Sequence, residues 1–316
     1  MKTLRAMIAG LGVMGATLSP LAAQAEYPEK PVEFIVPWSP GGGSDTQMRI
    51  VSNNAEPFLG QPMPIINMPG VGGTVGLKEA SKRAADGYTV SQVHEGLLVA
   101  NVTGLTDLNW DSFDPIGLMT VSPQYLVVNA NRPYETFDEF VAYAKENPGK
   151  VTIGVTLGGV PHLHAAMIED AYGLEFAYVG YEGTGERIRA LVGGNLDAAI
   201  GDIASSMQFV ENGDLRFLAT GNPERMDQTP DVPTFKELGQ DLELMITRGI
   251  VMPKGSPAEA RDGLEKALSE LAEDEDFIKQ MNNVGGEVAF RGQEDYSKYL
   301  DNLNATVERL AERLAP

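Results

Sequence analysis

The stretch "IVPWSPGGGSDTQMRI", from Ile35 to Ile50, joins an apolar strand to a polar segment through three consecutive glycines. Ser44 and Gln47 stand three residues apart, as in a capping box, so a helix is predicted to begin directly after the glycines. Backbone N–H groups at a helix N-terminus lack partners within the helix and favour an anion. A phosphate-binding P-loop would have a lysine here, whereas this loop continues with Ser44 and Asp45. The stretch therefore predicts an anion site of another kind.

Strands and helices alternate through the rest of the chain. Strands are predicted in the stretches VEFIVP, MPIIN, YTVSQV, QYLVVN, KVTIGV, FAYVG, LDAAIGD and LRFLAT. Helices follow most of them, TPDVPTFKELG is expected to form a loop and a short helix, and three helices close the chain, at 257–271, 276–284 and 293–314. Alternation with short connections favours an α/β protein with parallel or mixed doubly wound sheets, most simply two of them.

Two extended runs, SPQYLVVN and LMITRGIVMP, are long enough to cross between two domains. We therefore expect discontinuous domains. Residues 26–125 together with 249–316 are predicted to form domain I, and residues 126–248 to form domain II.

The first 25 residues have the pattern of a secretory signal peptide. Lys2 and Arg5 precede a short apolar stretch, and Ala23-Gln24-Ala25 matches an A-x-A cleavage signature. We expect export and cleavage after Ala25. The alternative, a membrane anchor, would need a longer apolar run.

Composition excludes several classes of function. The chain has no cysteine, which excludes disulfides, cysteine catalysis and thiolate metal sites. Its formal net charge is −20, and it becomes −22 without the first 25 residues, because these contain two basic and no acidic side chains. Such a surface repels nucleic acid and anionic lipid, so no nucleic-acid partner and a soluble monomer are expected. An anionic ligand must then be held by hydrogen-bond donors within the site that point directly at it.

A second glycine loop, "TLGGVPH" from Thr156 to His162, also follows a predicted strand and opens a helix. Pro161 suits the first helical position. Ligands of doubly wound domains lie at the carboxyl ends of strands, so two such loops, one in each domain, can face each other across a cleft and hold one anion. The alternative is that the glycines only form tight turns.

Several longer motifs occur in a characteristic order from Tyr27 onward: YPEKPVEFIVPWSPGGGSDTQMR, MPGVGGTVG, ADGYTV, VGYEGTGERIRALVGGNLDAAIGD and TPDVPTFKELG. Together they resemble the extracytoplasmic substrate-binding proteins of tripartite tricarboxylate transporters, the Bug family. The resemblance implies a periplasmic, two-domain binding protein of the Venus-flytrap type, with its cleft between two doubly wound sheets. It also implies capture of a small carboxylate, either a di- or tricarboxylate or an aromatic carboxylate, without a cofactor, and delivery to membrane permease subunits.

The resemblance places candidate ligand donors in both loops. In the first loop it implies the Ser39 side chain and the backbone of Gly41, Gly42, Gly43 and Ser44. Trp38 either forms part of the wall around the ligand or packs in the protein core. Asp45 is expected to stabilise the helix start rather than touch an anion. The second loop is one residue shorter than is usual in the family and has lost most hydroxyl groups. Its candidates are Thr156, Gly158, Gly159 and His162.

Four further side chains are candidates. Tyr181 matches a family position and either faces the cleft or packs in the core. Asp202 also matches one, and is expected to bind a ligand hydroxyl or amine. His94 is either a ligand contact or a buried histidine satisfied by Glu95. Arg248 presents a planar fork of donors that can grip a carboxylate, so we expect it to anchor the distal end of a dicarboxylate unless it pairs with a nearby acid.

Three alternatives concern the class of protein. His162 and His164 lie two residues apart at a helix start and point to different sides, so no metal site is expected. A hydrolase would carry a G-x-S-x-G elbow, which this chain lacks, so we do not expect an enzyme. A sensor that presents the bound carboxylate to a membrane signalling protein would share every one of these features, and it stays open beside transport.

Overall fold

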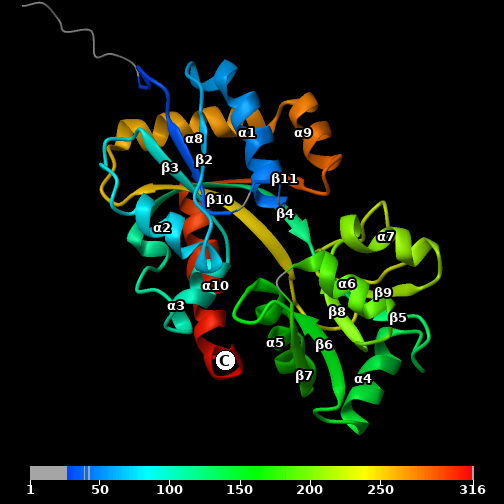
Figure 1. Cartoon of the computed structure of the whole chain (residues 1–316). Helices are drawn as coiled ribbons and strands as arrows, with labels where there is room; N and C mark the ends of the chain where they lie inside the picture. The colour runs from blue at the N-terminus through cyan, green and yellow to red at the C-terminus, as the bar shows by residue number, and fades with distance from the viewer. Residues whose placement is uncertain (1–26, 39, 42, 182, 315–316) are drawn as a thin grey trace, which may run out of the picture.

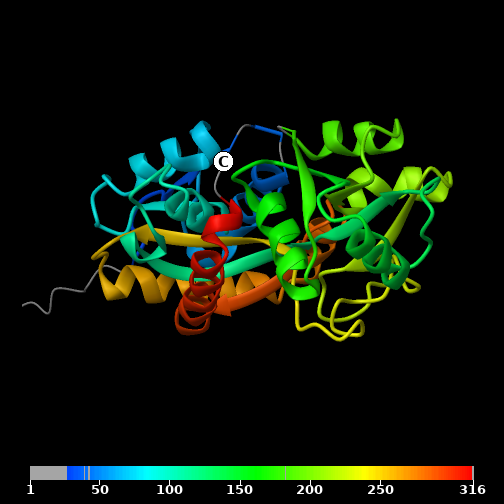
Figure 2. The same ribbon diagram turned by 90° about the horizontal axis from the view of Figure 1, so that it is seen from below.

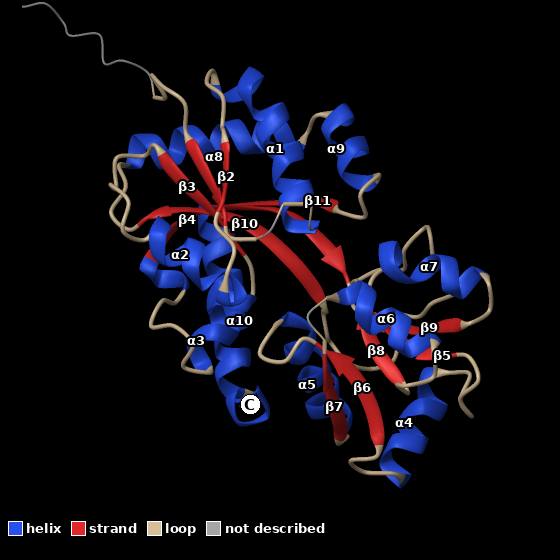
Figure 3. Cartoon of the chain, in the orientation of Figure 1, coloured by secondary structure: helices blue, strands red, loops and turns tan. Residues whose placement is uncertain are grey.

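The computed structural model describes residues 27–38, 40–41, 43–181 and 183–314. The predicted signal peptide and two candidate residues of the first loop, Ser39 and Gly42, lie outside the described residues. The chain forms two α/β lobes that lie side by side, each built around one sheet (Figures 1 and 3).

The first lobe is built on a six-stranded mixed sheet of order β11-β4-β10-β3-β1-β2. Its strands are β1 (Glu33–Val36), β2 (Ile65–Asn67), β3 (Thr89–Val93), β4 (Phe113–Pro123), β10 (Met245–Pro253) and β11 (Glu287–Gly292). Strand β1 is parallel to β2 and β3, whereas β10 is antiparallel to β3 and β4. The sequence patterns predict neither β4 nor β11.

The second lobe is built on a five-stranded mixed sheet of order β7-β6-β8-β5-β9. Its strands are β5 (Tyr125–Asn129), β6 (Val151–Val155), β7 (Phe176–Gly180), β8 (Ala198–Gly201) and β9 (Leu215–Thr220). Strand β6 is parallel to β7 and β8, and β5 is antiparallel to β8 and β9.

Helices cover both faces of each sheet. In the first lobe α1 (Gly43–Leu59), α8 (Ala258–Ala272) and α9 (Glu275–Asn282) cover one face, and α2 (Thr74–Ala80), α3 (Gly96–Val102) and α10 (Gln293–Arg309) cover the other. In the second lobe α4 (Phe137–Glu146) and α5 (Val160–Tyr172) lie opposite α6 (Thr184–Val192) and α7 (Ile203–Glu211). A last short helix, α11 (Ala311–Leu314), follows α10 and packs on α5 (Figure 2).

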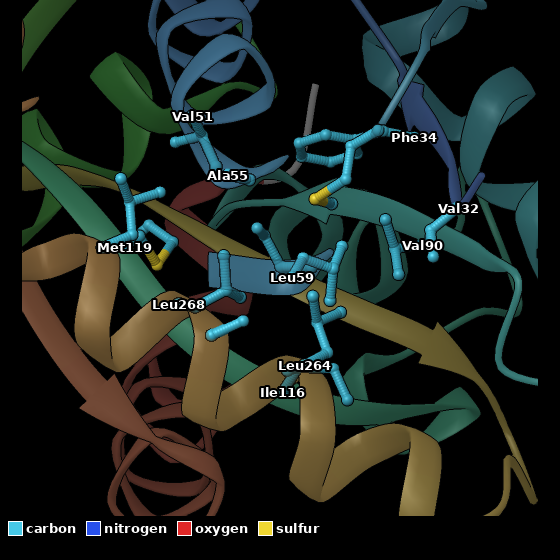
Figure 4. Close-up of a cluster of buried hydrophobic side chains, with 14 of the residues drawn as sticks. Val32, Phe34, Val51, Ala55, Leu59, Val90, Ile116, Met119, Leu264 and Leu268 are labelled. Atoms are coloured by element: carbon cyan, nitrogen blue, oxygen red, sulfur yellow. The ribbon is translucent and has the colours of Figure 1, made fainter. Parts of the chain in front are cut away.

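Periodic apolar positions explain how these helices dock. On α1 the residues Met48, Val51, Ala55 and Leu59 recur every three or four positions, and all four are buried. They meet Leu264 and Leu268 of α8 and strand residues such as Phe34 in the core of the first lobe (Figure 4). The inward face of α1 is predicted from this spacing, and the burial of the four residues confirms it.

The chain crosses between the lobes close to Gln124, because β4 ends at Pro123 and β5 begins at Tyr125. It returns before β10, whose residues Met245 to Arg248 pair with β4. The first sheet therefore contains segments from both ends of the chain. The predicted domain boundaries stay a prediction, although this pairing groups residues 245–248 with the first sheet rather than with 126–248.

The segment TPDVPTFKELG forms turns and no helix, contrary to the prediction. Phe235 N donates to Thr220 O at 3.1 Å, and Thr220 N donates to Pro233 O at 2.9 Å, so the segment lies along the end of β9. Phe235 is completely buried. Backbone pairing at Thr234 and the burial of the Phe235 ring hold the start of these turns against β9.

Candidate ligand-binding site

A cavity of about 460 Å³ lies between the two lobes. Its volume is within the range of pockets for small molecules. The first lobe contributes Trp38, Gly43, Ser44, Gly72, His94, Gly96, Ala100, Leu105, Ile246 and Arg248. The second lobe contributes Thr156, Gly158, Gly159, Val160, Pro161, Gly183, Thr184 and Asp202.

The wall formed by the first lobe carries the start of α1 and a buried guanidinium. Arg248 donates from Nε to Ser44 Oγ at 3.2 Å and from Nη1 to Ser122 Oγ at 2.9 Å. A Cβ atom added to Gly43 would lie 3.4 Å from Nη2 of the same side chain. Arg248 therefore stands beside the first turn of α1, where backbone N–H groups lack helical partners.

Arg248 lies beside the first glycine loop, whereas the prediction of a distal anchor places it at the opposite end of the ligand. Strand β10 runs between β3 and β4 in the middle of the first sheet, and from there the side chain reaches the first glycine loop. The predicted alternative, an exposed ion pair with a nearby acid, is wrong. Arg248 is only 5% exposed, and among the described residues no carboxylate forms an ion pair with it.

Arg248 stays positively charged although it is buried. Burial lowers its pKa to about 10, and the charges of Glu95 and Asp202 act in the opposite direction. The guanidinium therefore remains protonated at neutral pH. A buried charge without an ion-pair partner is costly, so an anionic ligand beside it is favoured.

Asp45 organises the first loop from inside the protein. Its carboxylate accepts hydrogen bonds from Gly41 N at 2.8 Å and from Asn67 Nδ2 at 2.7 Å, and it pairs with Arg49. Asp45 thus stabilises the helix start, as expected. The Gly41 N–H, a predicted ligand donor, is occupied by this contact, and Gly41 does not line the cavity.

Trp38 and His94 form a flat aromatic part of the wall. Their rings stack with centroids 4.5 Å apart and planes 14° apart. His94 Nδ1 accepts a hydrogen bond from Gly96 N at 2.8 Å, and burial, with a smaller effect of Arg248, lowers the pKa of His94 to about 3. The ring is therefore neutral, and its proton is inferred to be on Nε2. Glu95 does not satisfy His94, because its carboxylate accepts from Thr247 N instead.

The wall formed by the second lobe carries the starts of α5 and α6. Thr156, Gly158 and Gly159 connect β6 to α5, and Thr184 begins α6. His162 lies behind this loop and is 2% exposed; its Nδ1 accepts from Gly158 N at 3.2 Å. It does not line this cavity, but it lines an adjoining cavity of about 620 Å³ that shares Trp38, Thr156 and Gly159 with it. Tyr181 lines neither cavity, because its ring packs on the apolar cluster beneath α6.

Asp202 lies on the wall of the second lobe and caps α7. Its Oδ1 accepts from Ser205 N at 2.8 Å. The Asp202 carboxylate raises the pKa values of both Arg187 and Arg248, against the effect of burial. It therefore places one negative charge in a cavity that two guanidinium groups flank.

Arg187 was missed by the sequence analysis. It is completely buried on α6, and among the described residues no carboxylate pairs with it. Burial lowers its pKa to about 10, and Asp202 raises it. Arg187 lies one turn before the buried Leu191, so helical periodicity could have placed it on the inner face. An arginine on a short polar helix would otherwise be interpreted as exposed.

The cavity brings together nine of the predicted residues: Trp38, Gly43, Ser44, His94, Thr156, Gly158, Gly159, Asp202 and Arg248. In the described part of the chain, no group of three or more histidine or acidic side chains is arranged to hold a metal ion. No described helix is long and apolar enough to cross a membrane.

A second cavity of about 440 Å³ lies against the crossing at Pro123 and shares Asp202 with the first. Its other charged residues are Glu224, Asp227 and Glu287, together with Arg225, whose charge pairs with Glu237 at 3.0 Å. This acidic lining repels an anion. The cavity beside Arg248 is therefore the candidate site.

Comparison with known proteins finds relatives over nearly the whole chain. Residues 47–315 match the family model described as "Tripartite tricarboxylate transporter family receptor". A UPF0065 protein in the gbd 5' region of Cupriavidus necator is 32% identical over 297 residues, which are 92% of this chain and 90% of that protein.

Solved structures share the two-lobed architecture. A TctC solute-binding protein from Polaromonas, without ligand, superposes with a TM-score of 0.81 at 27% identity, over 91% of this chain and 99% of that chain. MatC from Rhodopseudomonas palustris, with bound malate, gives a TM-score of 0.71 at 25% identity, over 91% of this chain and all of that one.

Proposed function

The chain belongs to the tripartite tricarboxylate transporter receptor family, as its motifs indicated, and we propose that it captures a small carboxylate in the cavity between its lobes for delivery to the membrane subunits of such a transporter. Its fold is that of two-domain periplasmic binding proteins. The family and these structural neighbours are solute-binding proteins rather than enzymes.

One observation carries the proposal. In a chain of formal net charge −20, the cavity places the buried and unpaired guanidinium of Arg248 beside the N-terminus of a 17-residue helix. Both features favour negative charge at the same point. A carboxylate matches the planar fork of a guanidinium through two parallel hydrogen bonds. The malate bound to MatC is consistent with this class of ligand.

We assign a role to each wall. The wall of the first lobe holds a carboxylate at Gly43, Ser44 and Arg248. The Trp38–His94 stack supports the body of the ligand, whether aliphatic or aromatic, and His94 offers Nε2–H as a donor. The wall of the second lobe offers Thr156, Gly158, Gly159 and Thr184 to the other end of the ligand, and Asp202 accepts from a ligand hydroxyl or amine.

Thermal unfolding of the purified protein tests the proposal. The ligands are malate, succinate, adipate, citrate and benzoate, with glucose and putrescine as neutral and cationic controls. A bound carboxylate at 100 times its Kd should stabilise the protein by about 2.7 kcal/mol and should be recovered unchanged. Stabilisation only by the controls, or conversion of the ligand, would contradict the proposal.

Delivery and location need separate tests. We propose a periplasmic monomer that begins at Glu26 after signal cleavage. N-terminal sequencing of the exported protein checks the cleavage position, and light scattering checks that it is a monomer. Uptake of a labelled carboxylate by cells that carry the permease should require this protein. Retained uptake without it would favour the sensor alternative.

A further inference from the structure

Two threonine hydroxyl groups on the wall of the second lobe share one buried partner. Arg187 donates from Nη1 to Thr156 Oγ1 at 3.3 Å and from Nη2 to Thr184 Oγ1 at 3.2 Å. Its Nε donates to Ile200 O at 2.7 Å, which fixes the guanidinium against β8. Thr156 precedes α5 and Thr184 begins α6, so Arg187 connects the two loops that form this wall.

These contacts determine what the hydroxyl groups can do. A hydroxyl whose oxygen accepts from a guanidinium still has its own hydrogen to donate. Among the described residues, neither Thr156 nor Thr184 has an acceptor for that hydrogen, and both residues line the cavity. The two hydroxyl groups are therefore available as donors to a ligand acceptor in the cavity.

The charge of Arg187 acts in the same direction. The side chain is completely buried, and no described carboxylate forms an ion pair with it. Its Nη atoms contact the two threonines, which themselves line the cavity. A donor that itself accepts from a cation is polarised, so its hydrogen bond to an anion is strengthened.

We infer that Arg187 is a positioning residue that turns the hydroxyl groups of Thr156 and Thr184 into a pair of anion donors on the wall of the second lobe. The inference rests on the proposed capture of a carboxylate. It adds that the wall facing Arg248 has its own buried cation, which acts through the two threonines without touching the ligand.

The experiment compares matched variants by calorimetric titration with malate, succinate and adipate. Arg187→Met removes the guanidinium, and Arg189→Met removes the same charge from an exposed position on the same helix. The double variant Thr156→Val/Thr184→Val removes both hydroxyl groups at nearly constant volume, and Thr156→Ser/Thr184→Ser keeps them. Thermal unfolding without ligand measures the stability of each variant separately.

Arg187→Met and the valine pair should each lose about 10- to 100-fold in affinity, the range of a hydrogen bond to a charged group. Arg189→Met and the serine pair should stay within about threefold of the wild type, as expected for a solvated charge and for a retained hydroxyl. The triple variant with Arg187→Met and both valines should lose little more than either alone, because the three residues act as one unit.

The possible failures are distinguishable. A wild-type protein that binds none of the carboxylates would overturn the proposed function, and the inference with it. A folded Arg187→Met variant with wild-type affinity, or losses that multiply fully in the triple variant, would overturn the inference alone. If Arg187→Met fails to fold, the valine and serine pairs still decide, since equal affinities of these two would exclude the hydroxyl donors.

Discussion

Arg248 places a positive charge inside a strongly acidic protein, and its hydrogen bonds go to neutral oxygens rather than to an acid. Ser44, Ser122 and the Ile246 carbonyl accept its hydrogen bonds. Such acceptors hold the geometry of the guanidinium but leave its charge uncompensated. The ligand can supply the missing charge, and this makes Arg248 the first residue to test.

Arg248→Met should weaken carboxylate binding by about 1.5–3 kcal/mol, the scale of a hydrogen bond to a charged group. Because Arg248 stands beside the first turn of α1, monocarboxylates and dicarboxylates should both lose affinity. Calorimetric titration with benzoate and malate measures this. The control is Arg291→Met, which removes the same charge from an exposed position on β11. Equal and small losses in the two variants would remove Arg248 from the site.

Gly73 controls the aromatic part of the wall from outside the cavity. A Cβ atom at Gly73 would lie 2.8 Å from the Trp38 ring, and its φ of +87° already disfavours other residues. Gly73→Ala should therefore displace Trp38 and weaken ligand binding. Gly60 has a φ of +80° with nothing within 4 Å of an added Cβ, so Gly60→Ala is the matched control.

Both alanine variants should lose about 1–2 kcal/mol of stability, because each forces alanine into a left-handed conformation. Only Gly73→Ala should change ligand affinity and the tryptophan fluorescence. The assignment of Trp38 to the ligand-binding wall would be wrong if the Gly73 variant bound as tightly as the Gly60 variant.

At the scale of elements, Glu95 joins three segments of the first lobe. It precedes α3, accepts from Thr247 N of β10 at 2.9 Å, and accepts from Tyr299 OH of α10 at 3.3 Å. Burial raises the pKa of Glu95 to about 7, while its contacts with Thr247 and the charge of Arg248 lower it. The folded protein therefore holds a proton that an exposed glutamate, with a pKa near 4.5, has lost.

This raised pKa gives stability a predictable dependence on pH. The contribution of Glu95 is complete below about pH 4.5 and is lost as pH rises through about 7. Relative to Glu95→Gln, the wild type should lose at most about 3 kcal/mol over that window. Denaturant unfolding from pH 4.5 to 8 measures the difference. The three histidines, whose pKa values are all lowered by burial, titrate in both proteins and cancel, so a difference that is constant with pH would contradict the prediction.

Elements with one clear periodicity were predictable, and those defined by long-range pairing were not. Helix α1 has a capping serine and a regular apolar stripe, so its start and its inner face followed from the sequence. The strand β11 lies between two helices, its apolar run is only the three residues Val288 to Phe290, and these are only half-buried. Its pairing with β4 brings together residues about 170 positions apart, and no local pattern indicates that contact.

The residues of the candidate site also differ in whether the sequence alone could predict them. Glycine loops and helix starts are local features, so Gly43, Ser44, Thr156 and Gly159 were predictable from the sequence, and all four line the cavity. The function of each buried arginine depends on which strand or helix it faces across the lobe. Arg248 was noticed, but its contact with the first glycine loop was not foreseen, and Arg187 was not noticed, because its threonine partners come from two separate loops.

At the scale of the whole molecule, the C-terminal helices join the two lobes. An apolar cluster spans them, with Leu98 and Val99 on α3, Leu163 and Ala166 on α5, and Val307, Leu310 and Leu314 at the end of the chain. Arg313 pairs with Glu169 of α5 at 3.2 Å, and Arg309 pairs with Asp170. The last described helix, α11, lies beside α5 in both views (Figures 1 and 2). Beyond the strand crossings, this contact restrains one lobe against the other.

Removing that contact should loosen α5 selectively. Leu310→Ala/Leu314→Ala deletes two buried side chains of the joining cluster, each worth about 2–5 kcal/mol at a well-packed position. Backbone amides of α5 should then exchange with solvent faster, because the helix loses its packing partner while its own sheet is untouched.

The control, Leu264→Ala/Leu268→Ala, removes the same atoms from α8 in the core of the first lobe. It should speed exchange in α1 and α8 and leave α5 protected. Hydrogen exchange followed by mass spectrometry separates the two patterns, and unchanged protection of α5 in the C-terminal variant would mean that the strand crossings alone hold the lobes together.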